Sequence, residues 1–387
     1  MTFEPPRRLR GIAKSAIRDF FDRAPAGSIN LGLGEPDLPT PQVVRDAAVR
    51  AIQNERNGYT THAGLPALRE RIASLYPGQR DRGDVERVIV TAGSQEALYL
   101  ALLTLVDEGD EVLLPNPGFV AYPSIVAMAG GRAVFYRLPG ARDFAFDAQD
   151  FRRQVSPRTK AVVCISPSNP TGRALRRQDL EEMAAALSGT NAVVVSDEIY
   201  RDLYFDSARP PSIADHYPDT IVVSGLSKSM SMTGWRLGWL VGPADIVRSA
   251  LVLHGYVTTC ASAISQKAGL AAWSEQAEAA RSDMRATFRD RRDHLLLAAR
   301  QTLGLRAVMP DGAFYTMLET ARYGSSRQVA ETLLQHGVIT VPGSTFGTEG
   351  EGFLRLSFCA DKPALTEGVR RIDAALATLR KGEELRV

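Results

Sequence analysis

Short β-branched runs alternate with amphipathic helical stretches along residues 85–242, and no other feature of the chain constrains its fold as strongly. Runs such as AVVCI (161–165) and AVVV (192–195) are apolar without a break, which is typical of strands covered on both faces of a sheet. Helical stretches between them indicate crossover connections and a mostly parallel sheet. The sequence therefore predicts an α/β fold. The predicted strands are residues 87–91, 111–114, 133–138, 161–165, 192–196, 221–224 and 237–241, and the predicted helices are 95–106, 120–129 and 178–187.

The pattern changes after Gly242, where a polar, alanine-rich helical stretch covers residues 262–303. Strand-like runs return at 313–318 and 353–358. Because 387 residues are enough for two cores, we expect two domains. The predicted large domain is 46–285, and residues 1–45 and 286–387 are predicted to form a smaller α+β domain.

Composition excludes several classes of function. The formal net charge of +2 offers no basic surface for nucleic acid. Cys164, Cys260 and Cys359 are far apart, without metal-ligand spacing, so we expect reduced thiols in the cytoplasm and no metal. The longest apolar helical run, 97–106, is about half of the ~20 residues that a membrane span needs. We therefore expect a soluble, cytoplasmic protein.

The segment SGLSKSMSMTGWRLG (224–238) holds the first candidate site residues. Burial beside other cations would lower the pKa of Lys228 and let its amine attack an aldehyde. Arg236 could clamp a phosphate with paired N–H donors, and the hydroxyls of Ser227 and Ser224 could add hydrogen bonds. For a lysine and an arginine taken alone, a surface loop with both side chains solvated is the favoured alternative.

Two more candidates follow buried strands directly, where parallel sheets place their ligands. In AVVVSDEIY (192–200), Asp197 could pair with a protonated ring nitrogen. In SPSNPTG (166–172), Asn169 offers an amide donor toward the same edge of the sheet. Ordinary polar turns are the alternative for each segment taken alone.

Two further segments suggest anion binding. Gly93 and Ser94 in TAGSQEA (91–97) open a helix whose exposed N–H groups favour a phosphate, although Ser94 could be a plain helix cap. Arg355 is a lone charge in the strand FLRLSF (353–358). If it faces inward it requires a carboxylate, and if it faces outward it carries no function.

In their joint order, these segments resemble class I/II aminotransferases of fold type I, with a mostly parallel seven-stranded sheet in the large domain. The resemblance covers nearly the whole chain. It rests on LGLGEPDLPTP, NGYTTHAGLPALRE, TAGSQEAL, PNPGFVAYPS, SNPTG, SDEIY, SKSMSMTGWRLG, PDGAFY, VPGSTFG and RLSF.

The resemblance implies a bound pyridoxal 5'-phosphate and a role for each matching residue. Lys228 would hold the cofactor as an internal aldimine and then move the proton of the substrate Cα. Asp197 would pair with the pyridine nitrogen, and Tyr200 and Asn169 with the phenolic oxygen. Phe119 would stack on the ring.

The remaining implied contacts concern phosphate, substrate and partner subunit. The phosphate would be held by Gly93, Ser94, Gln95, Ser227 and Arg236. Arg355 would bind the substrate α-carboxylate, beside Gly34 and Asn169. Tyr59 would reach the phosphate of a neighbouring subunit, which implies a homodimer with shared active sites.

Two positions depart from the family pattern. Gly225 stands where many members have serine, so one phosphate contact is lost or is replaced by Ser227. Gln95 stands where some relatives that use aspartate place a lysine, which puts specificity for an acidic side chain in doubt.

The implied activity is ping-pong transfer of an amino group between an L-amino acid and a 2-oxo acid. The alternative on the same scaffold is a lyase that eliminates, cyclises or decarboxylates, and the cofactor residues do not separate the two. A transcription regulator with an aminotransferase-like module is not expected, because only about 28 residues precede LGLGEPD and no basic stripe is present.

Overall fold

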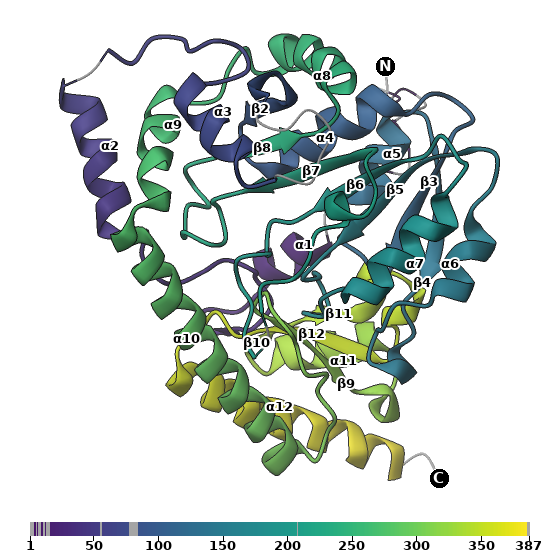
Figure 1. The fold of residues 1–387 in the computed structure, drawn as a ribbon. Helices are drawn as coiled ribbons and strands as arrows, with labels where there is room; N and C mark the ends of the chain where they lie inside the picture. Colours follow the sequence, from purple (N-terminus) through teal and green to yellow (C-terminus); the bar gives the residue numbers. More distant parts are fainter. Residues whose placement is uncertain are drawn as a thin grey trace.

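A seven-stranded sheet with helices on both faces forms the upper part of the molecule in Figure 1. The computed structural model describes residues 16–54, 56–76, 84–206 and 208–384, together with positions 4, 6, 9, 10 and 12. The strands follow the spatial order β2-β8-β7-β6-β5-β3-β4. Their bounds are β2 (Val88–Thr91), β3 (Glu111–Asn116), β4 (Arg132–Arg137), β5 (Thr159–Ile165), β6 (Val193–Asp197), β7 (Thr220–Gly225) and β8 (Gly238–Val241).

All seven predicted strands are present, and the predicted α/β fold is confirmed. The strand pairs from β7 to β4 are parallel. β8 is antiparallel to both of its neighbours, β2 and β7. The reason lies in the connection: β7 returns to β8 through residues 226–237 without a crossover helix, and parallel pairing requires such a crossover. This connection carries Lys228.

The apolar runs of the sheet are buried because their side chains alternate between two covered faces. In β5, for example, Val163 and Ile165 join the hydrophobic cluster on one face, whereas Val162 and Cys164 join a cluster on the other. The predicted helices 95–106, 120–129 and 178–187 correspond to α4, α5 and α7. The helices of this part are α2 (Gln42–Asn54), α3 (Pro66–Ala73), α4 (Ser94–Leu105), α5 (Ala121–Met128), α6 (Ala148–Gln154), α7 (Arg177–Leu187), α8 (Ala244–Val257) and α9 (Ala263–Gly269).

A second region lies below the sheet in Figure 1 and contains the chain's C-terminal third and part of its beginning. It has an antiparallel sheet of order β11-β12-β9 and a parallel pair of β1 with β10. The strands are β1 (Ile29–Asn30), β9 (Tyr315–Glu319), β10 (Val338–Ile339), β11 (Val341–Pro342) and β12 (Phe353–Ser357). The helices are α1 (Ala16–Asp22), α10 (Glu275–Ala298), α11 (Ser326–Gln335) and α12 (Lys362–Glu384).

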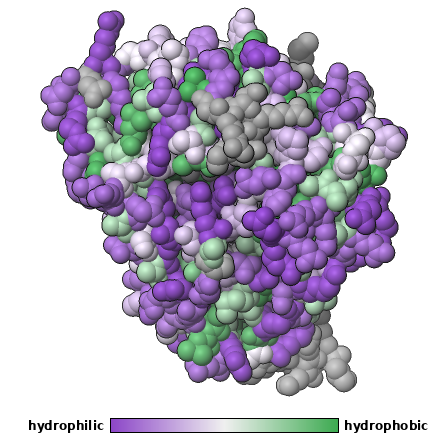
Figure 2. All heavy atoms as spheres, in the orientation of Figure 1, coloured by the Kyte–Doolittle hydropathy of each residue, from purple (hydrophilic) through white to green (hydrophobic). Residues whose placement is uncertain are grey.

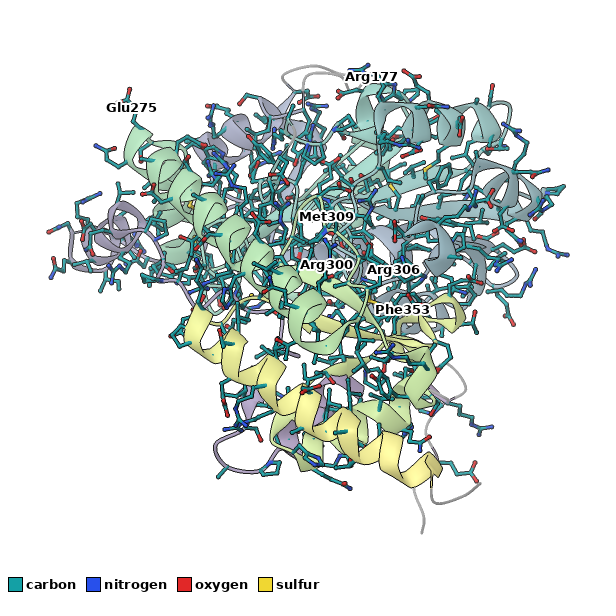
Figure 3. The ribbon with its side chains drawn as sticks, turned by 90° about the horizontal axis from the view of Figure 1, so that it is seen from below. Arg177, Glu275, Arg300, Arg306, Met309 and Phe353 are labelled. Atoms are coloured by element: carbon teal, nitrogen blue, oxygen red, sulfur yellow. The ribbon has the colours of Figure 1, made fainter. Side chains whose placement is uncertain are left out.

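The long helix α10 connects the two regions. Figure 3 labels Glu275 at its start and Arg300 just beyond its end, in the π-helical turn η6 (Ala299–Leu303). The strand-like runs predicted at 313–318 and 353–358 are β9 and β12. The domain boundaries stay a prediction, and α10 runs across the one placed at residue 285.

Hydrophilic side chains cover most of the face shown in Figure 2, with smaller apolar groups between them. Within the described ranges, none of the helices combines the length and apolar character that a membrane span requires.

Candidate active site

A cavity of about 260 Å³ lies at the carboxyl ends of the parallel strands. Asp197 ends β6, Asn169 follows β5, and Lys228 follows β7. Arg355 on β12 reaches the same cavity from the second region. The cavity is lined by Ile17, Leu33, Gly34, Ser94, Gln95, Leu98, Phe119, Ile165, Asn169, Asp197, Ile199, Tyr200, Ser227, Lys228, Thr233, Arg236, Tyr315 and Arg355.

Lys228 is turned into this cavity rather than toward solvent. Its Nζ donates a hydrogen bond to the Gly34 backbone oxygen at 2.8 Å. Burial, the largest cause, lowers the pKa of the Lys228 amine, and the cations Arg355 and Arg236 lower it further. The surface-loop alternative for Lys228 is therefore wrong, and the amine is held closer to its neutral form.

Asp197 is a buried carboxylate with two donors of its own. Tyr122 Oη donates to Oδ2 at 2.8 Å, and the Ile199 backbone N–H donates to Oδ1 at 3.2 Å. Burial raises the pKa of Asp197 to about 6, while these hydrogen bonds oppose the shift. Tyr122 was not predicted from the sequence as a site residue, although it stands three residues after Phe119 in the motif PNPGFVAYPS.

We expect Tyr122→Phe to weaken the ionised form of Asp197. A hydrogen bond to a charged group contributes about 1.5–3 kcal/mol, so its loss raises the pKa of Asp197 further and lowers kcat about tenfold or more. The control is Tyr136→Phe, which removes a buried hydroxyl bonded to the Val163 backbone oxygen in the same sheet. Steady-state rates measured from pH 6 to 9 test this, and equal rates for the two variants would contradict it.

Arg355 is a buried cation without a counter-ion in the part of the chain that the structure describes. Its side chain is 1% exposed and lies over the rings of Tyr315 and Phe346. Nη1 donates to Asn169 Oδ1 at 2.8 Å, Nη2 donates to the Gly32 backbone oxygen, and Nε has no partner. The outward-facing alternative is therefore wrong, and a carboxylate ligand would supply the missing charge.

Burial also lowers the pKa of the Arg355 guanidinium, which shows how poorly this environment solvates its charge. Next to it, the hydroxyls of Tyr200 and Tyr315 are hydrogen-bonded at 3.0 Å. Tyr315 also explains Gly34, because a Cβ at that position would overlap the Tyr315 hydroxyl. Tyr315 was another residue that the sequence reasoning missed, although it lies in the quoted motif PDGAFY.

The turn before α4 forms the opposite wall. Gly93 has a φ of +86°, and a Cβ there would overlap the guanidinium of Arg236. Ser94 and Gln95, the first two residues of α4, line the cavity together with Arg236. Backbone N–H groups in the first turn of a helix have no acceptor within the helix. Behind the turn, Glu96 accepts a hydrogen bond from the Ala92 N–H and lies 3.0 Å from Nδ1 of the buried His254.

Of three further positions named in the sequence, only Ser224 departs from its suggested role. Tyr59 is 90% exposed and does not line the cavity of its own chain. Ser224 donates instead to the Glu198 backbone oxygen and lines another cavity, so its suggested part in this site is wrong. Gly225 has no room for serine, because a Cβ would come within 2.7 Å of the Leu237 backbone oxygen.

The described residues contain no group of three or more His, Cys, Asp or Glu side chains that could hold a metal ion. The ionisable side chains that line this cavity are one amine, one carboxylate, two phenols and two guanidiniums.

Solved aminotransferases share this fold. The aspartate aminotransferase of Thermus thermophilus with maleate superposes with a TM-score of 0.91 and 33% identity, covering 97% of this chain and 100% of that one. The aromatic aminotransferase of Pyrococcus horikoshii OT3 superposes with a TM-score of 0.88 and 34% identity, covering 95% of this chain and 100% of that one. The fold and cavity therefore define an enzyme of the aminotransferase class.

The sequence comparisons specify the family. Aspartate aminotransferase of Pyrococcus horikoshii is 34% identical over 384 residues, which are 95% of this chain and 96% of that protein. The family model described as aminotransferase class I and II matches residues 26–372. The chain belongs to this family, and the predicted aminotransferase activity is confirmed over the lyase alternative.

Proposed function

We propose that the chain is a pyridoxal-phosphate-dependent aminotransferase in which Lys228 holds the cofactor covalently and Arg355 binds the α-carboxylate of both substrates. One observation carries the proposal: a buried arginine, with no carboxylate partner among the described residues, shares a cavity with a lysine of lowered pKa and a buried aspartate. Each of these groups is costly to bury. The arginine would match the substrate carboxylate, the lysine the cofactor aldehyde, and the aspartate the protonated ring nitrogen.

The residues present fit this cofactor. The N-terminus of α4, with Gly93 and Arg236 in contact, offers N–H donors and a guanidinium to a phosphate, and Ser94, Gln95 and Ser227 border the same end. Asp197 would face the pyridine nitrogen. The Asn169 amide nitrogen is available to a phenolic oxygen, because Arg355 occupies only Oδ1 of Asn169. The Tyr200 hydroxyl can donate to the same oxygen when Tyr315 is the donor of the Tyr200–Tyr315 pair.

When bound, the cofactor supplies an aldehyde that carries the amino group between substrates and a ring that delocalises the electron pair left on the substrate Cα. The protein does the rest. Lys228 Nζ would act as the general base that takes the substrate Cα proton. Asp197 remains ionised at neutral pH and favours a protonated ring nitrogen. Arg355, with Gly34 and Asn169 beside it, orients the substrate so that its Cα proton faces Nζ, and Phe119 supports the ring.

The Arg355 assignment is tested by Arg355→Lys. Lysine keeps the charge but loses the two-pronged pairing, so KM should rise about 10- to 100-fold for the amino acid and also for the 2-oxo acid. Arg87→Lys is the control, because Arg87 is equally buried but lies outside the cavity. A rise in KM for only one substrate would disprove a shared carboxylate site.

We further propose a homodimer in which Tyr59 contacts the cofactor phosphate of the neighbouring subunit. The support is its position: Tyr59 is 90% exposed, and the segment before it is held by Lys267, which donates to the Arg56 backbone oxygen at 2.7 Å. Tyr256, also 90% exposed, lies on α8, where a Cβ at the preceding Gly255 would come within 3.2 Å of His62 Nδ1. Exposed large apolar side chains are typical of an interface when they gather in one patch.

Mixed dimers test the shared site. Tyr59→Phe should weaken cofactor binding about tenfold in the homodimer, because one phosphate contact is lost. A mixed dimer of one Tyr59→Phe subunit and one Lys228→Ala subunit should recover wild-type affinity at a single site. That site combines Lys228 of the first subunit with Tyr59 of the second. Affinity that stays weak in the mixed dimer would place Tyr59 in its own subunit's site, and unchanged affinity in the Tyr59→Phe homodimer would place it outside any site.

The substrates are proposed as an L-amino acid and a 2-oxo acid, and the location as the cytoplasm. The location is supported by the three cysteines, which are unpaired, two of them buried. The related proteins include both aspartate and aromatic aminotransferases, so the side chain of the donor stays open. A screen of amino donors against 2-oxoglutarate and pyruvate identifies it. Ammonia released without an acceptor would indicate a lyase instead.

A further inference from the structure

A second cavity lies next to the candidate active site, and the two cavities share no lining residue. Its volume is about 240 Å³, close to the 260 Å³ of the first. Consecutive residues divide between the two: Asp197 lines the first and Glu198 the second, and Ser227 lines the first while Leu226 lines the second. The proposed aminotransferase chemistry uses none of the residues in the second cavity.

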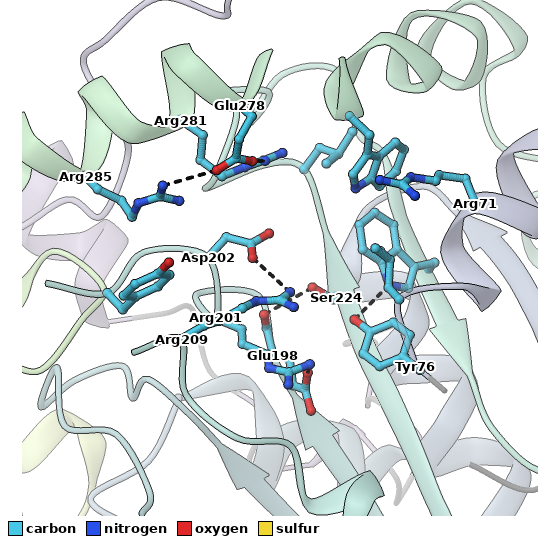
Figure 4. Close-up of a pocket in the computed structure, with 15 residues that line it drawn as sticks. Arg71, Tyr76, Glu198, Arg201, Asp202, Arg209, Ser224, Glu278, Arg281 and Arg285 are labelled. Atoms are coloured by element: carbon cyan, nitrogen blue, oxygen red, sulfur yellow. Dashed lines mark hydrogen bonds and ion pairs between the residues drawn. The ribbon is translucent and has the colours of Figure 1, made fainter. Parts of the chain in front are cut away.

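The second cavity is rich in arginine. Five arginines and three carboxylates line it, and Figure 4 shows that they come from separate elements around the open space. Arg281 and Arg285 lie on α10, Arg201 and Arg209 follow β6, and Arg71 lies on α3. The cavity therefore carries an excess of positive charge.

The three carboxylates are already paired, each with an arginine of the same cavity. Glu198 lies 3.0 Å from Arg201, and Asp202 lies 2.9 Å from Arg209. Glu278 contacts both Arg281 and Arg285 on its own helix (Figure 4).

Two guanidinium groups retain unused donors. Arg71 is held over the indole ring of Trp273 at 5.6 Å, and in the described ranges it has no carboxylate partner. Arg281 is 5% exposed, yet its Nε–H has no hydrogen-bond partner. A buried N–H without a partner is costly, and stacking on an aromatic ring fixes a guanidinium while leaving its N–H edge free.

From these contacts we infer a second ligand site, which binds a small oxyanion with at least two ionised oxygens, such as a phosphate or a polycarboxylate. Arg71 is its principal contact, since paired N–H donors match two oxygens of such a group. Arg281 adds its unpartnered Nε–H, because its Nη1 is paired with Glu278 and its Nη2 donates to the Ala272 backbone oxygen at 2.8 Å. The site is independent of the proposed roles of Lys228 and Arg355.

The position of this site connects it to the active site. The Ser224 hydroxyl donates to the Glu198 backbone oxygen at 3.1 Å, and Glu198 directly follows Asp197. An anion that attracts Arg201 competes with Glu198 for this arginine, and so acts on the segment that carries Asp197. Occupancy should therefore change the cofactor absorbance spectrum as well as produce a binding signal.

Calorimetric titration of the cofactor-loaded enzyme tests the inference, with inorganic phosphate in one arm and citrate in the other. We expect one saturable site per chain for at least one of them, weakened at least tenfold by Arg71→Ala and by Arg281→Gln. Arg289→Ala is the matched control, because Arg289 lies on α10 but outside the cavity, and it should bind like the wild type.

The two arms identify the ligand chemistry: binding of phosphate alone indicates a phosphoryl ligand, and binding of citrate alone a carboxylate ligand. Arg71 is exposed, so Arg71→Ala should fold normally even if Arg281→Gln does not. To exclude the active site, each titration is repeated in Arg355→Lys, where the affinity should be unchanged. The inference would be overturned if neither anion showed saturable binding, or if Arg71→Ala bound the anion as tightly as the wild type. Loss of anion binding in Arg355→Lys would also overturn it.

Discussion

Lys228→Ala is expected to lower kcat by about 10⁴-fold or more, the largest effect of any single change in this chain. The variant loses the covalent link to the cofactor and also the base that takes the Cα proton, and a positioned base alone contributes about 10²–10⁴-fold. Cofactor should still bind through the phosphate and ring contacts, but its absorbance should be that of the free aldehyde.

Lys160→Ala is the control for this variant, because Lys160 lies in β5 of the same sheet and does not line the cavity. It should keep both the wild-type rate and the wild-type spectrum. Added methylamine should partly restore the rate of Lys228→Ala, since it replaces the missing amine. Near-normal turnover without such an amine would disprove the catalytic role of Lys228.

Asp197→Asn is expected to produce the second largest loss, about 10²–10³-fold in kcat. Asparagine has nearly the same shape but cannot hold the ring nitrogen protonated. Asp150→Asn is the control, because Asp150 is equally buried, yet its partners are the Arg137 backbone N–H and the Arg153 side chain. An unchanged kcat in Asp197→Asn would remove the proposed role of Asp197.

The pH dependence of the free energy of unfolding distinguishes the proposed role of Asp197 from a purely structural one. The pKa of Asp197 is raised from 3.8 to about 6, so the folded protein binds its proton more tightly than the unfolded chain does. The free energy of unfolding of the cofactor-free protein therefore falls as pH rises from about 4 to 6, by at most about 3 kcal/mol. Cofactor-free Asp197→Asn should lack this fall and should be the more stable form at pH 7. Denaturant titrations at pH 5 and 7 test this.

The fold could be predicted from the sequence because its strands are buried on both faces. Runs such as 161–165 have no polar interruption, and the parallel order follows from the helices between them. The direction of β8 was not predicted, since it depends on the path of residues 226–237, which contain no periodic pattern. The short helices α3 and α6 were missed for a similar reason: one or two turns give little periodicity.

Most of the candidate site could also be predicted, because its residues follow strands directly. Asn169, Asp197 and Lys228 converge for that reason. Tyr122 and Tyr315 could not be assigned in this way, because their contacts with Asp197 and Tyr200 join segments far apart in the chain. The second cavity had no sequence signal at all, since its arginines belong to three unrelated segments.

Borohydride reduction of the cofactor-loaded enzyme, followed by peptide mass mapping, tests the central assignment most directly. Reduction converts a bond between the cofactor aldehyde and an amine into a permanent one. We predict a single pyridoxyl-modified peptide, with the modification on Lys228, and none in the Lys228→Ala variant. Modification of a different lysine, or no reducible bond after saturation with cofactor, would contradict the assignment.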